Sequence, residues 1–131
     1  MAHLNLMVLS APAPRTPTVM VVEDDDIIRL TTADFLESCG YIVLQAASVT
    51  AAKRWFDSHA IDLVFTDIEM PGGLNGIDLA EWVQTNYPNI PVIVTSGVAA
   101  HAAFGLAPMI KKPYALEELQ SRIQSALAQE Y

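Results

Sequence analysis

The sequence predicts an α/β fold, with helices on both faces of a doubly wound, five-stranded parallel sheet. Short runs rich in β-branched residues alternate along the chain with longer stretches whose apolar residues recur at helical spacing. Several of these runs are apolar throughout, as is typical of strands buried on both faces of a sheet. Strands that alternate with helices are joined by right-handed crossovers, which make the strands parallel. The 131 residues are enough for one such domain with its own core.

The first half of the domain contains two predicted strands and two helices. Residues 18–22, "TVMVV", form a continuous apolar strand, and residues 41–46, "YIVLQA", form the second. We expect Gly40 to end the helix between them and Ser48 to cap the start of the next helix. The inward face of the first helix consists of Ile28, Thr32, Phe35, Leu36 and Cys39. The inward face of the second consists of Val49, Ala52 and Phe56.

The second half contains three predicted strands and two clear helices. Residues 62–67, "DLVFTD", form the third strand, and a Pro-Gly-Gly loop leads from it into a helix. Residues 91–97 and 108–113 form the fourth and fifth strands. The inward face of the helix after the third strand consists of Leu79, Ala80, Val83 and Tyr87. The inward face of the last helix consists of Leu116, Leu119, Ile123 and Leu127.

The segment between the fourth and fifth strands fits the alternation of strands and helices poorly. It leaves room for barely two helical turns, and Gly97, Gly105 and Pro108 interrupt it. We therefore expect the fourth helix of the domain to be short or irregular.

Composition and charge exclude several classes of function. The formal net charge is −8 with only seven Lys and Arg residues, whereas binding to nucleic-acid phosphates needs clustered cations. Cys39 is the only cysteine, which excludes a disulfide framework or a Cys-based zinc site, and we expect it to be a small core residue. No apolar run approaches the ~18 residues of a membrane span. We therefore expect neither a nucleic acid nor a membrane as partner, and a cytoplasmic location.

Residues 1–16 are expected to form a flexible N-terminal extension, which leaves the domain proper at residues 17–131. Three prolines between Pro12 and Pro17 indicate an extended linker. The apolar stretch from Leu6 to Leu9 is too short for the core of a signal peptide.

Acidic, hydroxyl and basic side chains gather where the predicted strands end. Glu23 and Asp24 follow the first strand, and Asp67 closes the third. If the strand order is 2-1-3-4-5, these two strands are neighbours, and the three carboxylates converge at the edge where open α/β sheets bind ligands. Carboxylates so close repel one another unless solvent separates them or a cation binds them, and oxygen ligands favour Mg²⁺. Thr95 and Lys112 lie at the ends of the fourth and fifth strands.

The two acids that follow directly, Asp25 and Asp26, are interpreted differently. In the first turn of a helix, negative charge is favoured by the helix dipole, and Arg29 can pair with either residue. We expect a structural role for these two. Asp67, an acid after a Leu-Val-Phe run, has no evident structural role.

At these positions the sequence resembles the response-regulator receiver domain of two-component signalling, over nearly the whole chain outside the extension. The resemblance rests on "VVEDD" followed by Arg29, on "DLVFTDIEMPG" followed by "NGIDL", on "PVIVTSG", and on "KKPY" before the last helix. It implies that Asp67 is the phosphoacceptor. It also implies that Glu23 and Asp24 are the acidic pair that binds Mg²⁺ (or Mn²⁺), with the Asp67 carboxylate and the backbone carbonyl of Glu69 as further metal ligands.

The same resemblance implies a mechanism and partners. Asp67 would take a phosphoryl group from a histidine kinase or a histidine phosphotransfer protein, while Thr95 and Lys112 contact the phosphoryl oxygens. The domain would thus catalyse its own phosphorylation and dephosphorylation, as a signalling switch rather than a metabolic enzyme. Because no output domain follows the last helix, we expect a stand-alone receiver that acts on a downstream protein target, either as a monomer or as a homodimer.

Two features depart from the family pattern. Receivers usually carry Tyr or Phe on the fifth strand as a rotameric switch coupled to the threonine, and Met109 stands at that position here. The stretch from Thr95 to Lys112 is also shorter than is common in the family. We therefore expect this stretch to transmit activation without an aromatic switch.

Two other functions stay open at this point. A phosphatase of the haloacid dehalogenase type also phosphorylates an aspartate, but its motif places a second Asp where this chain has Glu69, and it normally has a cap domain. A degenerate receiver that binds partners without phosphorylation is the other alternative, which the intact acids, Thr95 and Lys112 disfavour. Dinucleotide binding is excluded, because no Gly-x-Gly-x-x-Gly follows the first strand.

Overall fold

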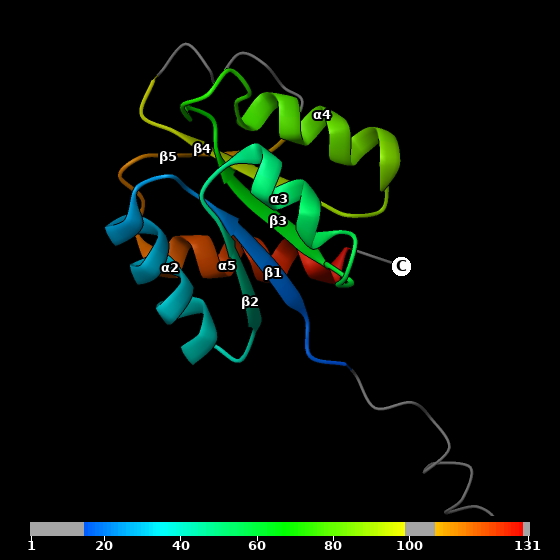
Figure 1. The fold of residues 1–131 in the computed structure, drawn as a ribbon. Helices are drawn as coiled ribbons and strands as arrows, with labels where there is room; N and C mark the ends of the chain where they lie inside the picture. Colours follow the sequence, from blue (N-terminus) through cyan, green and yellow to red (C-terminus); the bar gives the residue numbers. More distant parts are fainter. Residues whose placement is uncertain (1–14, 99–106, 130–131) are drawn as a thin grey trace, which may run out of the picture.

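Five parallel strands form one sheet in the order β2-β1-β3-β4-β5, as predicted (Figure 1). The computed structural model describes residues 15–98 and 107–129. The strands are β1 (Thr18–Val22), β2 (Ile42–Ala46), β3 (Leu63–Asp67), β4 (Val92–Ser96) and β5 (Met109–Lys111). The helices are α2 (Asp26–Ser38), α3 (Val49–Trp55), α4 (Gly76–Asn86) and α5 (Leu116–Ala128). The predicted strands therefore exist; β1 has the predicted bounds, and no end of the other strands differs from the prediction by more than two residues.

Helices cover both faces of the sheet, because successive strand residues point to opposite sides. Val19 and Val21 of β1 pack with Leu36 of α2 and with α5, whereas Met20 and Val22 pack with α3 and α4. Figure 1 shows α2 and α5 on one side of the strands and α3 and α4 on the other. The doubly wound architecture is thus confirmed.

Local sequence accounts for where the helices begin and end. The side chains of Asp25 and Ser48 accept hydrogen bonds from the first turns of α2 and α3, as helix caps do. Asn75 and Asp78 form a reciprocal capping box at the start of α4. Gly40 follows α2 with φ of 101°, a conformation that glycine adopts without strain.

Two predictions about the core are wrong. Cys39 is exposed rather than buried, because α2 ends at Ser38 and Cys39 is the residue that caps its end, beyond the turns that pack on the sheet. Tyr87 is 37% exposed, because it caps the end of α4 with φ of −140° and leaves the helical face. Its ring instead stacks on Phe56, with centroids 4.6 Å apart.

Two other predictions, the short fourth helix and the N-terminal extension, concern segments that lie mostly outside the described residues. The short fourth helix would lie largely on residues 99–106, and most of the N-terminal extension is residues 1–14; neither segment is among those the structure describes. Arg15, the first described residue, pairs with Asp62, the residue before β3. No helix within residues 15–98 and 107–129 is long and apolar enough to cross a lipid bilayer.

A close backbone approach joins the start of α4 to the end of β3. The N–H of Gly76 donates to the carbonyl of Ile68 at 2.9 Å. A Cβ on Gly76 would lie 2.1 Å from the Asp67 carbonyl oxygen, far inside any real contact. Only glycine can therefore stand at the first position of α4.

We predict that Gly76→Ala lowers the free energy of unfolding by about 3 kcal/mol or more, because α4 must move away from β3 to remove the overlap. Urea unfolding measures this change. Gly97→Ala is the matched control, since its added Cβ would meet nothing closer than 4.0 Å. Equal stability of the two variants would contradict the packing described here.

Candidate functional site

Four strand ends meet at one edge of the sheet. Asp67 closes β3 and pairs in register with Thr95 of β4. Glu23 follows β1, the neighbour of β3 on its other side, and Lys112 follows β5. The parallel sheet therefore brings together side chains that are far apart in the sequence, as the strand order predicted.

Lys112 joins the two buried acids of the site. Its Nζ lies 2.8 Å from a carboxylate oxygen of Glu23 and 2.8 Å from one of Asp67. Both acids are 4% exposed. The backbone N–H of Lys112 donates to the carbonyl of Ser96 at 2.9 Å, which positions the residue at the end of the sheet. One ammonium group thus neutralises part of the charge of two carboxylates.

Three carboxylates form a cluster that fits a metal ion. Oxygens of Glu23, Asp24 and Asp67 all lie within 4.8 Å of one another, with Asp24 exposed and the other two buried. The backbone N–H of Glu69 lies 3.3 Å from Asp67 Oδ1, so the backbone of residue 69 runs beside the cluster. A set made only of oxygen donors fits a hard divalent cation such as Mg²⁺.

The turn between β1 and α2 is fixed by Arg29. Its guanidinium donates to the backbone carbonyl of Glu23 at 2.8 Å and to the side chain of Gln45 at 3.3 Å. It also pairs with Asp26 at 2.7 Å. Asp25 caps α2, so the structural roles predicted for Asp25 and Asp26 are confirmed.

The hydroxyl of Thr95 is buried and has no hydrogen-bond partner among the described residues. Such a group is costly in a folded protein, and buried polar groups nearly always find a partner. The hydroxyl lies on the residue paired with Asp67. It is therefore available to a ligand that contains oxygen acceptors.

Burial dominates the electrostatics of the site. It raises the pKa of Glu23 and of Asp67, and the hydrogen bonds from Lys112 only partly offset this effect. Burial alone would lower the pKa of Lys112, but its hydrogen bonds to Asp67 and Glu23 outweigh that effect and raise it. At neutral pH the site therefore contains a firmly charged ammonium group beside carboxylates that are harder to ionise than usual.

Two contacts of the site were not predicted. Ser96 donates a hydrogen bond to the side chain of Glu69, and Arg29 donates to the carbonyl of Glu23. A serine directly after Thr95 was a visible signal for the first, but nothing in the sequence names its partner. Met109, which stands where an aromatic switch was expected, is half-buried and packs against the core on the α3 and α4 side.

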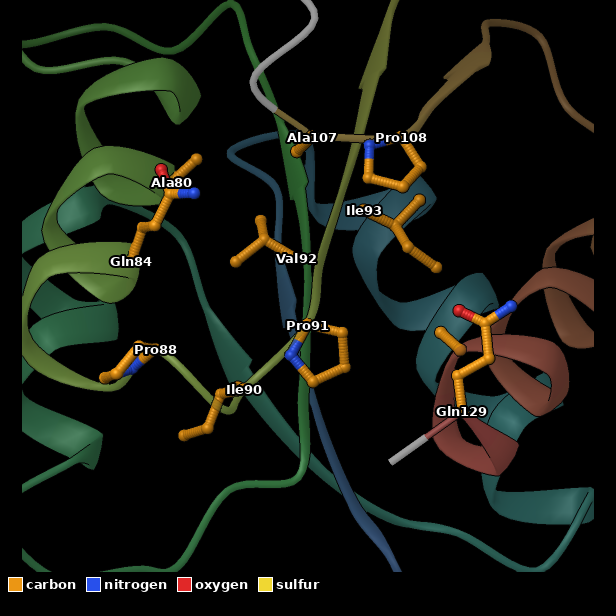
Figure 2. A pocket seen from close by; sticks show the side chains of 11 residues that line it. Ala80, Gln84, Pro88, Ile90, Pro91, Val92, Ile93, Ala107, Pro108 and Gln129 are labelled. Atoms are coloured by element: carbon orange, nitrogen blue, oxygen red, sulfur yellow. The ribbon is translucent and has the colours of Figure 1, made fainter. Parts of the chain in front are cut away.

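Among the hollows of the described residues, two differ clearly in their relation to the cluster. A cavity of about 270 Å³ lies at the amino end of β4, between α4 and the end of α5 (Figure 2). Pro91 and Val92 line it, whereas Thr95 lies at the other end of the same strand. A second hollow, of about 570 Å³, borders the site at Lys112 and is lined by Ile27, Ile28 and Tyr114, among others. The first is therefore remote from the carboxylates, and the second borders them through Lys112.

Comparisons with known proteins agree with this geometry. Residues 19–124 match the family model described as the response regulator receiver domain. The chain is 35% identical over 113 residues to the CAI-1 autoinducer sensor kinase/phosphatase CqsS of Vibrio cholerae, covering 80% of this chain and 16% of that protein. It is 32% identical over 121 residues to the sensor kinase CckA of Brucella abortus, covering 84% of this chain and 12% of that protein. The chain thus spans less than a fifth of either relative.

A solved structure with comparable sequence identity shows the same fold. The response regulator receiver domain protein from Clostridium thermocellum superposes with a TM-score of 0.77 at 28% identity. The match covers 86% of this chain and 95% of that one.

We predict that Lys112→Met lowers the free energy of unfolding by about 3 kcal/mol at neutral pH in EDTA, because it leaves two buried carboxylates without a counter-charge. Burial raises the folded-state pKa of both carboxyls above the unfolded value. Their ionisation therefore destabilises the fold as pH rises through that range, and the deficit should shrink as pH falls from about 7 toward 4. Urea unfolding across this range measures it. Lys111→Met, a change of the exposed neighbour, is the control, and an equal loss there would contradict the assignment.

Proposed function

The chain belongs to the response regulator receiver domain family of two-component signalling, and on this premise we propose that it is a switch phosphorylated on Asp67. The proposed donor is a histidine kinase or a histidine phosphotransfer protein, and the phosphorylated form signals by binding a downstream protein. Residues 17–131 carry this activity, and residues 1–16 form an extension to it.

One observation carries the proposal. The carboxylate of Asp67 is buried at the end of β3, bonded to Lys112 at 2.8 Å and within 4.8 Å of the carboxylate oxygens of Glu23 and Asp24. An acid in such a place has no role in packing the core. A carboxylate nucleophile with an adjacent ammonium group and a cation site is what phosphoryl transfer requires.

The transfer step can be written from these residues. An oxygen of Asp67 attacks the phosphorus of the donor's phosphohistidine, a new O–P bond forms, and the P–N bond breaks so that the imidazole leaves. The transition state is loose and its charge is spread over the phosphoryl oxygens, so catalysis depends on positioned charges and donors. The Lys112 ammonium group, which is bonded to Asp67, would contact one of these oxygens, and the buried hydroxyl of Thr95 would donate to another.

Glu23, Asp24, Asp67 and the backbone carbonyl of Glu69 would hold Mg²⁺. When bound, the ion supplies charge neutralisation to the phosphoryl oxygens. Reversal of the switch is hydrolysis: a water molecule attacks the phosphorus, the O–P bond to Asp67 breaks, and phosphate leaves. Asp67 then returns as a carboxylate beside Lys112.

We predict that acetyl phosphate with Mg²⁺ adds one phosphoryl group to the wild-type chain, and that Asp67→Asn abolishes the adduct because the amide is not a nucleophile. Intact-mass spectrometry measures both. Asp34→Asn, a change at an exposed acid of α2, serves as the control and should be phosphorylated normally. An adduct of equal yield on Asp67→Asn would refute the proposed phosphoacceptor.

We predict that Mg²⁺ stabilises the wild-type protein by mass action, by about 1.4 kcal/mol at ten times its Kd, which corresponds to a rise in Tm of about 4 °C. Asp24→Asn should remove most of this rise, since it removes one of three clustered carboxylates. Thermal unfolding with Mg²⁺ and with EDTA measures the difference. Asp26→Asn is the matched control, because it removes the same charge from the same turn but not from the cluster. An equal loss of the Mg²⁺-dependent rise in Tm in both variants would contradict the proposed cation site.

A further inference from the structure

The peptide unit that joins Glu23 to Asp24 is held by the side chain of Arg29. Arg29 Nη1 donates to the carbonyl oxygen of Glu23 at 2.8 Å. Among residues 15–98 and 107–129, no other group donates to this oxygen. Because a peptide unit is planar, the direction of this carbonyl fixes the plane in which the chain enters Asp24.

Asp24 depends on that backbone more than the other acids of the cluster do. Glu23 and Asp67 are buried, and each binds Lys112 at 2.8 Å. The side chain of Asp24 is exposed and has no hydrogen bond or ion pair with another described residue. Its position therefore follows from the backbone of residues 23 and 24.

Arg29 is itself fixed by contacts with two further elements. Its Nη2 pairs with Asp26 in the first turn of α2 at 2.7 Å, and its Nε donates to the side chain of Gln45 at 3.3 Å. Gln45 lies on β2, in register with Val21 of β1. The side chain of Arg29 is only 14% exposed. One planar guanidinium thus joins the end of β1 to α2 and to β2 in a single arrangement.

The charge of Arg29 and its geometry act on a bound cation in opposite directions. Its positive charge repels a cation at the cluster, and a partly buried charge is screened little by solvent, so loss of the charge alone should tighten Mg²⁺ binding. Loss of a residue that orients metal ligands weakens binding, by about tenfold or more. The sign of the change in Kd therefore distinguishes the two roles.

We propose that Arg29 is a positioning residue for the cation site, which holds the Glu23 carbonyl and thereby places the Asp24 carboxylate where a divalent ion binds. This inference rests on the proposed function of the cluster around Asp67. It gives a cationic side chain a favourable role in the binding of a cation, and only the geometry of the turn explains such a role.

The test uses the whole chain with Arg29→Met and Arg29→Lys, and calorimetric titration measures the Kd for Mg²⁺. Methionine removes the charge and every hydrogen bond, so the Kd should rise about tenfold. Lysine keeps the charge, but one ammonium group cannot reproduce the contacts of the planar guanidinium, so the Kd should rise about threefold. An equal or lower Kd in Arg29→Met would overturn the inference. If Arg29→Met does not fold, an unchanged Kd in Arg29→Lys would overturn it.

Two control variants isolate the bond to the Glu23 carbonyl. Arg54→Met makes the same change at an exposed arginine of α3 and should keep the wild-type Kd. Asp26→Asn removes the ion pair of Arg29 but leaves its bond to Glu23, so the Kd should stay within about twofold of the wild-type value. A tenfold rise in either control would overturn the inference, because the carbonyl bond would then not be the cause.

The dependence of phosphorylation on Mg²⁺ separates positioning from general damage to the fold. With acetyl phosphate, Arg29→Met should need about tenfold more Mg²⁺ for its half-maximal rate and should approach the wild-type rate when Mg²⁺ saturates. A lower saturating rate with an unchanged half-maximal concentration would overturn the inference. If the wild-type chain takes no phosphoryl group, the proposed function fails, and the calorimetric Kd values still decide the role of Arg29. If it takes one but binds no Mg²⁺, the inference fails and the assignment of Asp67 stands.

Discussion

The site depends on a single ammonium group between two buried carboxylates. Lys112 Nζ lies 2.8 Å from both Glu23 and Asp67, and burial raises the pKa of each of those acids. Without a cation nearby, two ionised carboxylates at this edge would be strongly unfavourable. The backbone bond from Lys112 to Ser96 therefore matters as much as the side-chain contacts, because it fixes the ammonium group relative to β4.

Under the proposed function, this arrangement must accept further negative charge. A phosphoryl group would enter a pocket that already contains excess carboxylates, so cations and donors must be in place before it arrives. Lys112 and the buried hydroxyl of Thr95 are two such groups, and the oxygen cluster around Asp67 fits a divalent ion. The energetic cost of this preorganisation falls on the free protein, in the form of a hydroxyl that is buried without a partner among residues 15–98 and 107–129 and of acids that resist ionisation.

At this edge, the two faces of the sheet carry different contacts. On one face, Thr95 lies beside Asp67. On the other, Ser96 binds Glu69, the residue whose backbone passes next to the cluster. The absence of a side chain at Gly76 allows α4 to begin against the backbone of Asp67, so the loop between them is held at both of its ends. Close packing, rather than any one bond, thus restricts how this loop can move.

Much of the fold was determined by the sequence alone, because strands, caps and stops depend on neighbouring residues. The apolar runs, the cap at Ser48 and the stop at Gly40 are local features, and the strand ends then implied that Asp67 would lie in a cluster of polar side chains. Tertiary structure alone decided the rest. Cys39 is exposed because of where α2 ends on the sheet. The bond between Ser96 and Glu69 joins residues 27 positions apart, and only the packed sheet brings two such segments within reach of one hydroxyl.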